Sequence, residues 1–503
     1  MRVRPDGRRF DTCRGDGYFR VMKRAGLRLL TRTHPAFAGT LLLVVVVCLV
    51  AVGAAVRPAA AQASVARGIA DPFFAYMPSP GEQQPGIDEI HNDLGAGYIR
   101  FFVSWASAEP TGPSITNPTY MAQVASAVQI ARLDNLKVIL TFNEVPEWAS
   151  DRALWKYTGP AGNTKYYSRE AMSTAGLADF QTFCQTVAAQ FKGEVWGYEV
   201  WNEPNLSLFL SPQLYPGHPH FAPDLYVKMV ASCRAGINAG DTSTPRPFIV
   251  AGGTDPRGSN DAGSTTPQSF ALRVKADGLG SKVPFDYYSH HPYMPGASPR
   301  LWPEAAPRDP KTTVTLENLG TLLKIFPTKN FLLTEYGVQT ADNGTFSHQY
   351  VNQATQADYL RRAYAYVARY KQVKLLMWYL LKDYAPARAV NGFYTGLDTA
   401  GGAHKRAWYV FAGGTSLTLN ATVTIKRGAA AKLTGTLAWR GKGFAAKPVL
   451  QSHRAGHPWA TVKTFTTQAT GRYTLWLRPK AATYYRVSWL GVVTSRFRLV
   501  SVH

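Results

Sequence analysis

The chain has 503 residues, of which 46% are hydrophobic and 17% charged, a globular composition that excludes a disordered or collagen-like protein. Its net charge of +23 lies at the two ends: residues 1–35 contribute +7, and residues 413–503 contribute +14 from fourteen Lys or Arg and no acid. The remaining residues, 36–412, carry only +2, so the charge does not indicate a nucleic-acid-binding protein and no nucleic-acid partner is expected.

Residues 1–63 have the pattern of an export segment. An Arg-rich stretch precedes 21 uncharged residues at 36–56, and small residues follow at 59–63. This order is typical of a secretory signal peptide cleaved after Ala63, although the apolar run is also long enough for a retained membrane anchor. Both alternatives place the chain from residue 64 onward outside the cytoplasm, either extracellular or associated with the cell envelope.

Residues 64–412 alternate between short apolar runs and segments of helical periodicity. The predicted strands are 69–75, 97–104, 137–142, 195–201, 247–253, 284–289, 329–334 and 373–380. The predicted helices are 85–96, 117–135, 170–192, 222–239, 267–278, 311–325, 353–369 and 402–412. Eight such units predict a (β/α)₈ barrel. A doubly wound open sheet is the alternative, but no Gly-rich phosphate turn follows the first predicted strand.

After residue 412 the pattern changes to short alternating strands between turns, which predicts a small β-sandwich over residues 413–503. This segment resembles the immunoglobulin-like appendages of secreted bacterial proteins. Its excess of cations suggests attachment to an anionic cell-envelope polymer or an acidic polysaccharide, with solubility as the alternative explanation.

Four cysteines occur, and Cys13 and Cys48 belong to the export segment. Cys184 and Cys233 lie in two predicted helices, where they either pair or remain separate buried thiols. The sequence has no clustered His/Cys spacing typical of a zinc site, so neither a metal nor a cofactor is expected.

Two carboxylates follow predicted strands at the barrel end where reactive side chains belong. Glu203 stands in Trp201-Asn202-Glu203-Pro204-Asn205 after the fourth strand, and Glu335 stands in Thr334-Glu335-Tyr336-Gly337 at the end of the seventh. Two carboxylates converging on one cleft can hydrolyse a glycosidic bond, one by giving a proton and the other by attacking the sugar carbon. The sequence therefore predicts an oligo- or polysaccharide substrate.

These two motifs resemble the clan A retaining glycoside hydrolases, which include the cellulase-like family 5 and the β-xylosidase/iduronidase family 39. The resemblance covers roughly residues 68–412. It implies that Glu203 is the acid/base, that Glu335 is the nucleophile and that Asn202 binds the sugar 2-hydroxyl. Arg100, on the second strand, would keep the nucleophile ionised.

The resemblance extends to two later segments. His291 and Tyr293 match the clan's H-x-Y element after the sixth strand, and Tyr293 would donate to the nucleophile; strand phase must choose between His290 and His291. Trp378, on the eighth strand, would be the aromatic floor under the sugar, with ordinary barrel packing as the alternative. Glu144, after the third strand, is interpreted as lining the cleft or contacting substrate.

The sequence thus predicts an exported retaining glycosidase that works by double displacement. The alternative is a catalytically silent carbohydrate-binding or surface-adhesion protein on the same scaffold. The sugar, the linkage, exo or endo action, the individual family and the oligomeric state are left open by the motifs.

Overall fold

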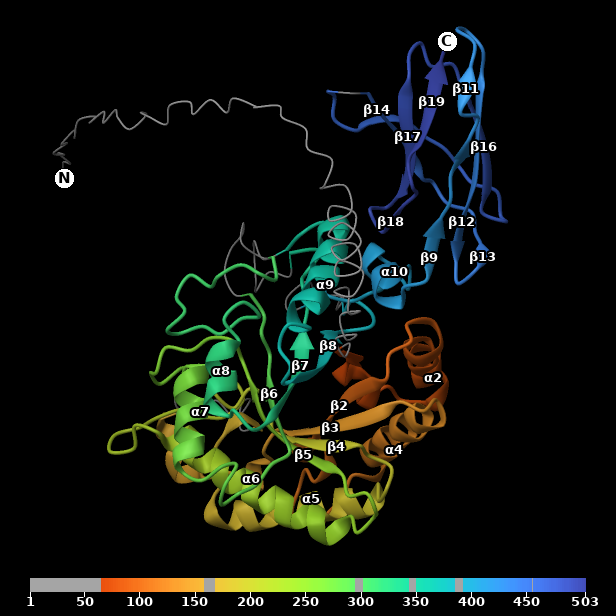
Figure 1. The fold of residues 1–503 in the computed structure, drawn as a ribbon. Helices are drawn as coiled ribbons and strands as arrows, with labels where there is room; N and C mark the ends of the chain where they lie inside the picture. Colours follow the sequence, from red (N-terminus) through yellow and green to blue (C-terminus); the bar gives the residue numbers. More distant parts are fainter. Residues whose placement is uncertain (1–64, 158–167, 295–301, 343–349, 385–391, 455) are drawn as a thin grey trace, which may run out of the picture. The chain divides into compact units, whose positions relative to one another are not determined.

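Eight parallel strands close into a barrel in the computed structural model, with helices around its outside (Figure 1). The structure describes residues 65–503 except 158–167, 295–301, 343–349, 385–391 and 455, so the predicted export segment lies outside the described residues. Within the described part of the chain, no helix combines the length and apolarity needed to cross a membrane.

The barrel strands follow one another in chain order, and β8 pairs with β1 to close the sheet. They are β1 (Ala66–Ala70), β2 (Tyr98–Ser104), β3 (Lys137–Asn143), β4 (Gly197–Val200), β5 (Phe248–Thr254), β6 (Tyr287–His290), β7 (Asn330–Tyr336) and β8 (Val373–Tyr379). The (β/α)₈ prediction is therefore confirmed, and the open-sheet alternative is excluded.

The helices of the barrel are α2 (Pro80–Asp88), α3 (Trp105–Ala108), α4 (Pro118–Leu133), α5 (Thr174–Gln190), α6 (Phe221–Gly240), α7 (Pro267–Ala276), α8 (Gly320–Ile325), α9 (Gln353–Val367) and α10 (Arg406–Ala412). Short 3₁₀ turns occur at η1 (Pro72–Tyr76), η3 (Glu147–Ala149) and η4 (Arg152–Tyr157), and a π turn, η2 (Glu89–Asp93), extends α2. Side-chain caps fix several helix starts: Asn117, Ser173, Thr266 and Asn352 each accept a hydrogen bond from a first-turn amide.

Two elements differ from the sequence prediction. The first strand ends at Ala70 instead of residue 75, because Asp71 caps the 3₁₀ turn that begins at Pro72. The helix predicted at 311–325 forms only from Gly320 to Ile325. The preceding Thr-rich stretch is held in a turn. In this turn the Asn318 side chain accepts a hydrogen bond from the Thr315 amide and donates one to the Thr313 carbonyl.

Strand alternation divides the barrel into an outer core and an inner plug. Residues such as Ile99, Val138, Leu333 and Trp378 point outward and pack with the helices in one large hydrophobic cluster. The inner plug is a separate cluster made of Ala70, Ile139, Val250, Leu332, Leu375 and Met377. Because side chains alternate between faces, the next inward residues on β3 and β7, Thr141 and Thr334, lie above this plug, at the carboxyl end of the barrel.

The C-terminal segment forms two β-sheets. One contains β9 (Thr415–Leu417), β10 (Asn420–Ala421), β12 (Ala431–Trp439), β13 (Lys442–Gly443) and β16 (Arg472–Leu477). The other contains β11 (Thr424–Ile425), β14 (Val449–His453), β15 (Ala460–Thr464), β17 (Thr483–Trp489), β18 (Val493–Thr494) and β19 (Arg498–Val502). Side chains of both sheets share one hydrophobic core, which confirms the predicted sandwich. The finer resemblance to immunoglobulin-like appendages stays a prediction.

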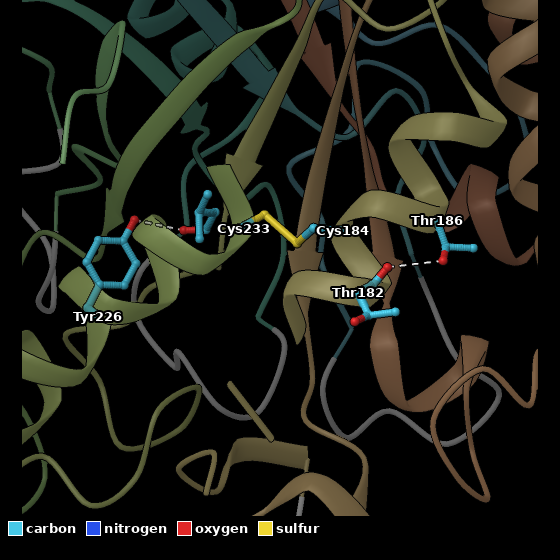
Figure 2. Close-up of a disulfide and its surroundings, with 6 residues drawn as sticks. Thr182, Cys184, Thr186, Tyr226 and Cys233 are labelled. Carbon is cyan, nitrogen blue, oxygen red and sulfur yellow. Dashed lines mark hydrogen bonds between the residues drawn. A yellow bond between two sulfur atoms is a disulfide. The ribbon is translucent and has the colours of Figure 1, made fainter. Parts of the chain in front are cut away.

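A disulfide joins Cys184 on α5 to Cys233 on α6, so the paired alternative is the one the structure adopts (Figure 2). The two helices approach closely at this point. A Cβ atom added to Gly236 would collide with the backbone carbonyl of Gln181, so only glycine fits that position.

Removing the disulfide should lower the free energy of unfolding substantially. The bond closes a loop of 49 residues, and the loop-entropy model assigns such a loop about 4 kcal/mol. We predict that the double variant Cys184→Ser/Cys233→Ser unfolds at a clearly lower urea concentration than the parent chain. Dithiothreitol should lower the parent's midpoint but not the variant's; a parent midpoint indifferent to reductant would contradict the prediction.

Candidate active site

A cavity of about 450 Å³ opens at the carboxyl ends of the barrel strands. Its polar lining residues include Asn202, Glu203, Asp255, Tyr293 and Glu335. Besides Tyr293, its aromatic lining residues are Phe73, Tyr76, Phe102, Phe209, Tyr336, Tyr379 and Phe393. The cavity combines apolar faces with convergent polar groups, which is the usual composition of a small-molecule binding site.

Arg100 connects the polar groups beneath this cavity. The side chain is 1% exposed, and its three nitrogens each reach a different partner: Nε lies 2.6 Å from Glu199, Nη1 lies 2.7 Å from Glu335, and Nη2 lies 3.0 Å from the Asn202 amide oxygen. Because the Asn202 oxygen accepts from Arg100, its NH₂ group remains available as a donor to a ligand in the cavity.

Glu199 is a buried carboxylate that the sequence analysis did not identify. It is inaccessible to solvent and accepts hydrogen bonds from Thr141 Oγ1 at 2.7 Å and Thr334 Oγ1 at 2.8 Å, besides that from Arg100. Burial alone would raise the pKa of Glu199, but the Arg100 guanidinium, His291 and the hydroxyl donors together hold it below the ordinary value. Glu199 is therefore ionised in the folded chain.

The ionised Glu199 determines how His291 is protonated. Thr334 has a single hydroxyl hydrogen, which it donates to Glu199, so its oxygen must accept from His291 Nε2 at 3.1 Å. The other ring nitrogen, Nδ1, lies 2.9 Å from Glu203 Oε1. One proton therefore lies between His291 and Glu203, either on the carboxyl group or on the imidazole, and the two groups titrate as a pair.

Burial and neighbouring charges shift the pKa values of this pair. Burial raises the pKa of Glu203 above its ordinary value, although the hydrogen bond from His291 opposes the shift. For His291, burial lowers the pKa, but the carboxylates of Glu335 and Glu203 outweigh it, and the net shift is upward. Both shifts favour the state in which the pair keeps its shared proton.

Glu335 has a different environment, in which both oxygens accept hydrogen bonds. Arg100 donates to Oε1 at 2.7 Å, and the Tyr293 hydroxyl donates to Oε2 at 3.0 Å. One carboxylate oxygen of Glu203, one of Glu335 and a ring nitrogen of His291 all lie within 4.8 Å of one another. The site thus holds the Glu203–His291 pair, with its shared proton, directly beside the carboxylate of Glu335.

The backbone that presents Glu203 is strained. Trp201 and Glu203 have φ angles of 73° and 41°, a region that side chains other than glycine rarely adopt. The Trp201 indole donates to the Phe209 carbonyl at 2.8 Å, and the Glu203 amide donates to the Gly253 carbonyl at 2.9 Å. The buried Asn205 side chain holds the segment after β5: its NH₂ group donates to the carbonyls of Arg257 and Thr265, and its oxygen accepts from the Asp255 amide.

The structure brings six of the seven predicted site residues together: Arg100, Asn202, Glu203, His291, Tyr293 and Glu335. It also resolves the choice between the two histidines. His290 points away, toward Thr254 Oγ1 at 2.8 Å and the Val314 carbonyl at 3.0 Å, and burial lowers its pKa to about 3.

Trp378 is a correction to the sequence prediction. Its side chain is fully buried, donates to the Thr395 carbonyl at 2.7 Å and does not line the cavity. On β8 the inward positions are Leu375, Met377 and Tyr379, so Trp378 faces the helices and Tyr379 is the ring in the cavity.

One further expectation changes, and one lining residue was not expected. Glu144 accepts a hydrogen bond from Ser104 and is not among the residues that line the cavity, so the interpretation as cleft lining is not supported; the alternative, a substrate contact, stays a prediction. Asp255, at the carboxyl end of β5, does line the cavity, although no motif pointed to it. Burial, followed by the charge of Glu203, raises the pKa of Asp255 to about 7. The signal that could have found it is its position immediately after a buried strand.

Two groups of described residues have a spacing that could hold a metal ion: Glu203, His291 and Glu335 in the cavity, and Glu89, Asp398 and His404 outside it. In the first group the Arg100 guanidinium already lies 2.7 Å from Glu335. A cation added there would face that fixed positive charge, which disfavours metal binding.

A model of the cellulase family, glycosyl hydrolase family 5, matches residues 70–382, which is more than half of the chain. Similar solved structures include a family 39 glycoside hydrolase from Bacteroides cellulosilyticus WH2, at 16% identity and a TM-score of 0.49, covering 88% of this chain and 81% of that one. A GH30 endoxylanase from Clostridium papyrosolvens C71 shows 11% identity and a TM-score of 0.42, covering 85% of this chain and 97% of that one. No curated protein matches the chain in sequence.

Neutralising Glu199 should destabilise the chain by about 3 kcal/mol or more, because Arg100 would lose its most buried partner. The lowered pKa of Glu199 means that its contribution is full above its ordinary value of 4.5 and is lost as the pH falls. We predict that the stability difference between the parent and Glu199→Gln, measured by urea unfolding, is large at pH 7 and smaller near pH 4.

The matched control is Glu304→Gln, which breaks the half-exposed pair between Glu304 and Arg362. Partly solvated pairs contribute about 0–1 kcal/mol, so this change should have little effect. Equal losses from the two variants would contradict the structural role assigned to Glu199.

Proposed function

Because the chain belongs to glycosyl hydrolase family 5 and is an enzyme that hydrolyses glycosidic bonds, we propose that it is an exported retaining glycosidase in which Glu335 is the nucleophile and Glu203 the acid/base. The observation that carries this proposal is the pair of carboxyl groups in one cavity, with oxygens within 4.8 Å of each other. Inverting enzymes need about 6.5–9.5 Å between the two groups to admit a water molecule, whereas retaining enzymes need about 5–5.5 Å.

In the first step the ionised Glu335 attacks the anomeric carbon, and the bond from that carbon to the leaving-group oxygen breaks. The proton shared by Glu203 and His291 passes through Glu203 to the departing oxygen, so the leaving group departs as an alcohol. The product of this step is a glycosyl ester on Glu335. Arg100 and Tyr293 hold the carboxylate in place until the bond forms, and the NH₂ group of Asn202 is placed to donate to a sugar hydroxyl.

In the second step a water molecule attacks the same carbon. The Glu203–His291 pair takes the water's proton, the ester bond to Glu335 breaks, and the sugar leaves with its original anomeric configuration. The hydrogen-bonded chain from Glu203 through His291 and Thr334 to Glu199 supports this role, because it keeps His291 oriented in both protonation states. A silent binding protein would have no use for such an arrangement.

Export is supported by two independent features. The first 63 residues have the composition of a signal peptide or membrane anchor. The disulfide between Cys184 and Cys233 is a bond that persists mainly in oxidising compartments outside the cytoplasm.

Covalent trapping tests the proposed nucleophile. A panel of aryl glycosides would first identify the sugar that the enzyme accepts. The corresponding 2-deoxy-2-fluoro glycoside should then inactivate the enzyme in a time-dependent way, and peptide mapping should find the label on Glu335. A label on another residue would overturn the assignment, and the Asp309→Asn variant, altered at an exposed acid, serves as a positive control for labelling.

For the acid/base, we predict that Glu203→Ala lowers turnover of unactivated substrates by roughly 10²–10⁴-fold. Aryl glycosides with good leaving groups should be less affected in the first step, because they need no proton. Azide should then accelerate the second step and yield a glycosyl azide of retained configuration. No acceleration by azide, or a product of inverted configuration, would argue against the proposed role.

The carboxyl group of Asp255 should influence the pH profile. Its negative charge, present above a pKa of about 7, opposes loss of the proton held by Glu203 and His291. We predict that Asp255→Asn moves the alkaline limb of kcat/KM toward lower pH, because the pair then releases its proton more readily. Asp309→Asn should leave the limb unchanged, and an Asp255→Asn profile identical to the parent's would contradict the coupling.

A further inference from the structure

One face of the C-terminal sandwich carries aromatic side chains that its own core does not use. On β17 the side chains of Tyr485, Val487 and Trp489 are buried in the core, whereas Tyr484 and Arg486 between them are only half-buried. This alternation places Tyr484 and Arg486 on the outer face of the sheet.

The rings on this outer face form a continuous row across neighbouring strands. Tyr484 lies opposite His453 of β14, and their ring centroids are 6.0 Å apart. His453 lies 5.3 Å from the ring of Trp459, just before β15, and Tyr484 lies 5.6 Å from the ring of Phe497, just before β19. We call these four residues, Trp459, His453, Tyr484 and Phe497, the ring row. Phe497 is 59% exposed, and the other three are partly exposed.

A fixed cation lies over one end of the ring row. The guanidinium carbon of Arg486 is 4.2 Å from the centroid of Trp459, and its Nε donates to Gln451 Oε1 at 2.8 Å. The segment 413–503 contains fourteen Lys or Arg and no Asp or Glu, so no side-chain carboxylate of this segment can neutralise Arg486. The face therefore offers flat apolar surfaces together with an excess of positive charge.

We propose that the ring row and Arg486 form a binding site for an acidic polysaccharide, distinct from the catalytic cavity. The apolar faces of sugar rings stack on aromatic side chains, and a guanidinium binds the carboxylate of a uronic acid through paired hydrogen bonds. A neutral polysaccharide would use the rings but not the charge. A nucleic acid could use both; the sugar polymer is favoured because the same chain hydrolyses glycosidic bonds.

The experiment measures binding of the exported protein to polygalacturonate, a uronic acid polymer, by isothermal titration calorimetry at about 150 mM salt, where the Debye length is about 8 Å. We expect Trp459→Ala and Arg486→Gln each to raise the dissociation constant about tenfold. The thermal unfolding midpoint should hardly change, because both side chains lie on the outer face.

The sheet of the sandwich that contains β16 supplies matched controls. Trp476, on β16, is 59% exposed and has Lys432 5.7 Å from its ring, so Trp476→Ala removes an indole that is more exposed than Trp459 and also lies beside a cation. Arg472→Gln removes one exposed charge from the same strand, which matches the change in net charge made by Arg486→Gln. Both controls should change the dissociation constant less than twofold.

Three results would overturn the proposal. If Arg486→Gln and Arg472→Gln raised the dissociation constant for polygalacturonate equally, the polymer would be bound by the net charge of the segment and not by this face. Equally tight binding of a neutral dextran would remove the role of the cation. Tighter binding of single-stranded oligothymidylate than of polygalacturonate at the same salt would make the face a nucleic-acid site. None of these results bears on hydrolysis, because trapping of Glu335 tests the barrel separately.

Discussion

The buried guanidinium of Arg100 is the interaction on which the site depends. Taking a charge of this size out of water is costly, and the cost is offset only when opposite charges and hydrogen bonds surround it. Glu199 supplies the first opposite charge and Glu335 the second. One cation, two carboxylates and a Glu203–His291 pair that is neutral as a whole leave the cluster with a net charge of about −1. In the proposed mechanism this negative charge lies on Glu335 before it attacks the sugar. Ester formation neutralises Glu335, and the charge passes to the Glu203–His291 pair, which has given its proton to the leaving group.

The position of the site follows from strand alternation in the barrel. The inward side chains form an apolar plug at one level, including Ile139 and Leu332, and become polar two residues later, at Thr141 and Thr334. The plug excludes water from below, so the polar layer lies in a low-dielectric setting where each hydrogen bond is stronger. Within this layer the direction of a single hydroxyl hydrogen, on Thr334, is sufficient to fix the tautomer of His291.

The sequence was most informative where local order and function coincide. The eight alternating units predicted the barrel, and the motifs around Glu203 and Glu335 predicted two residues that the fold brings together. It was least informative where strand phase or long-range contact decides. Trp378 was expected in the cavity, but its neighbour Tyr379 has the inward phase. Glu199 was missed because, in sequence, a carboxylate inside an apolar strand shows neither its arginine nor its two threonine partners.

Membership in a family of hydrolases accounts for the chemistry of this chain but not for its sugar, and the distribution of residues explains why. The groups that would break the bond stand on β2 and β7 or within a few residues after β4 and β6, where the barrel positions them. Several of the rings that would contact the sugar stand outside the strands: Phe209 and Phe393 are on connections between elements, and Phe73 is on the 3₁₀ turn η1. Loops can change their side chains without disturbing the barrel, so the same catalytic framework can serve many substrates. We therefore expect the rings on these connections to contribute to the choice of sugar.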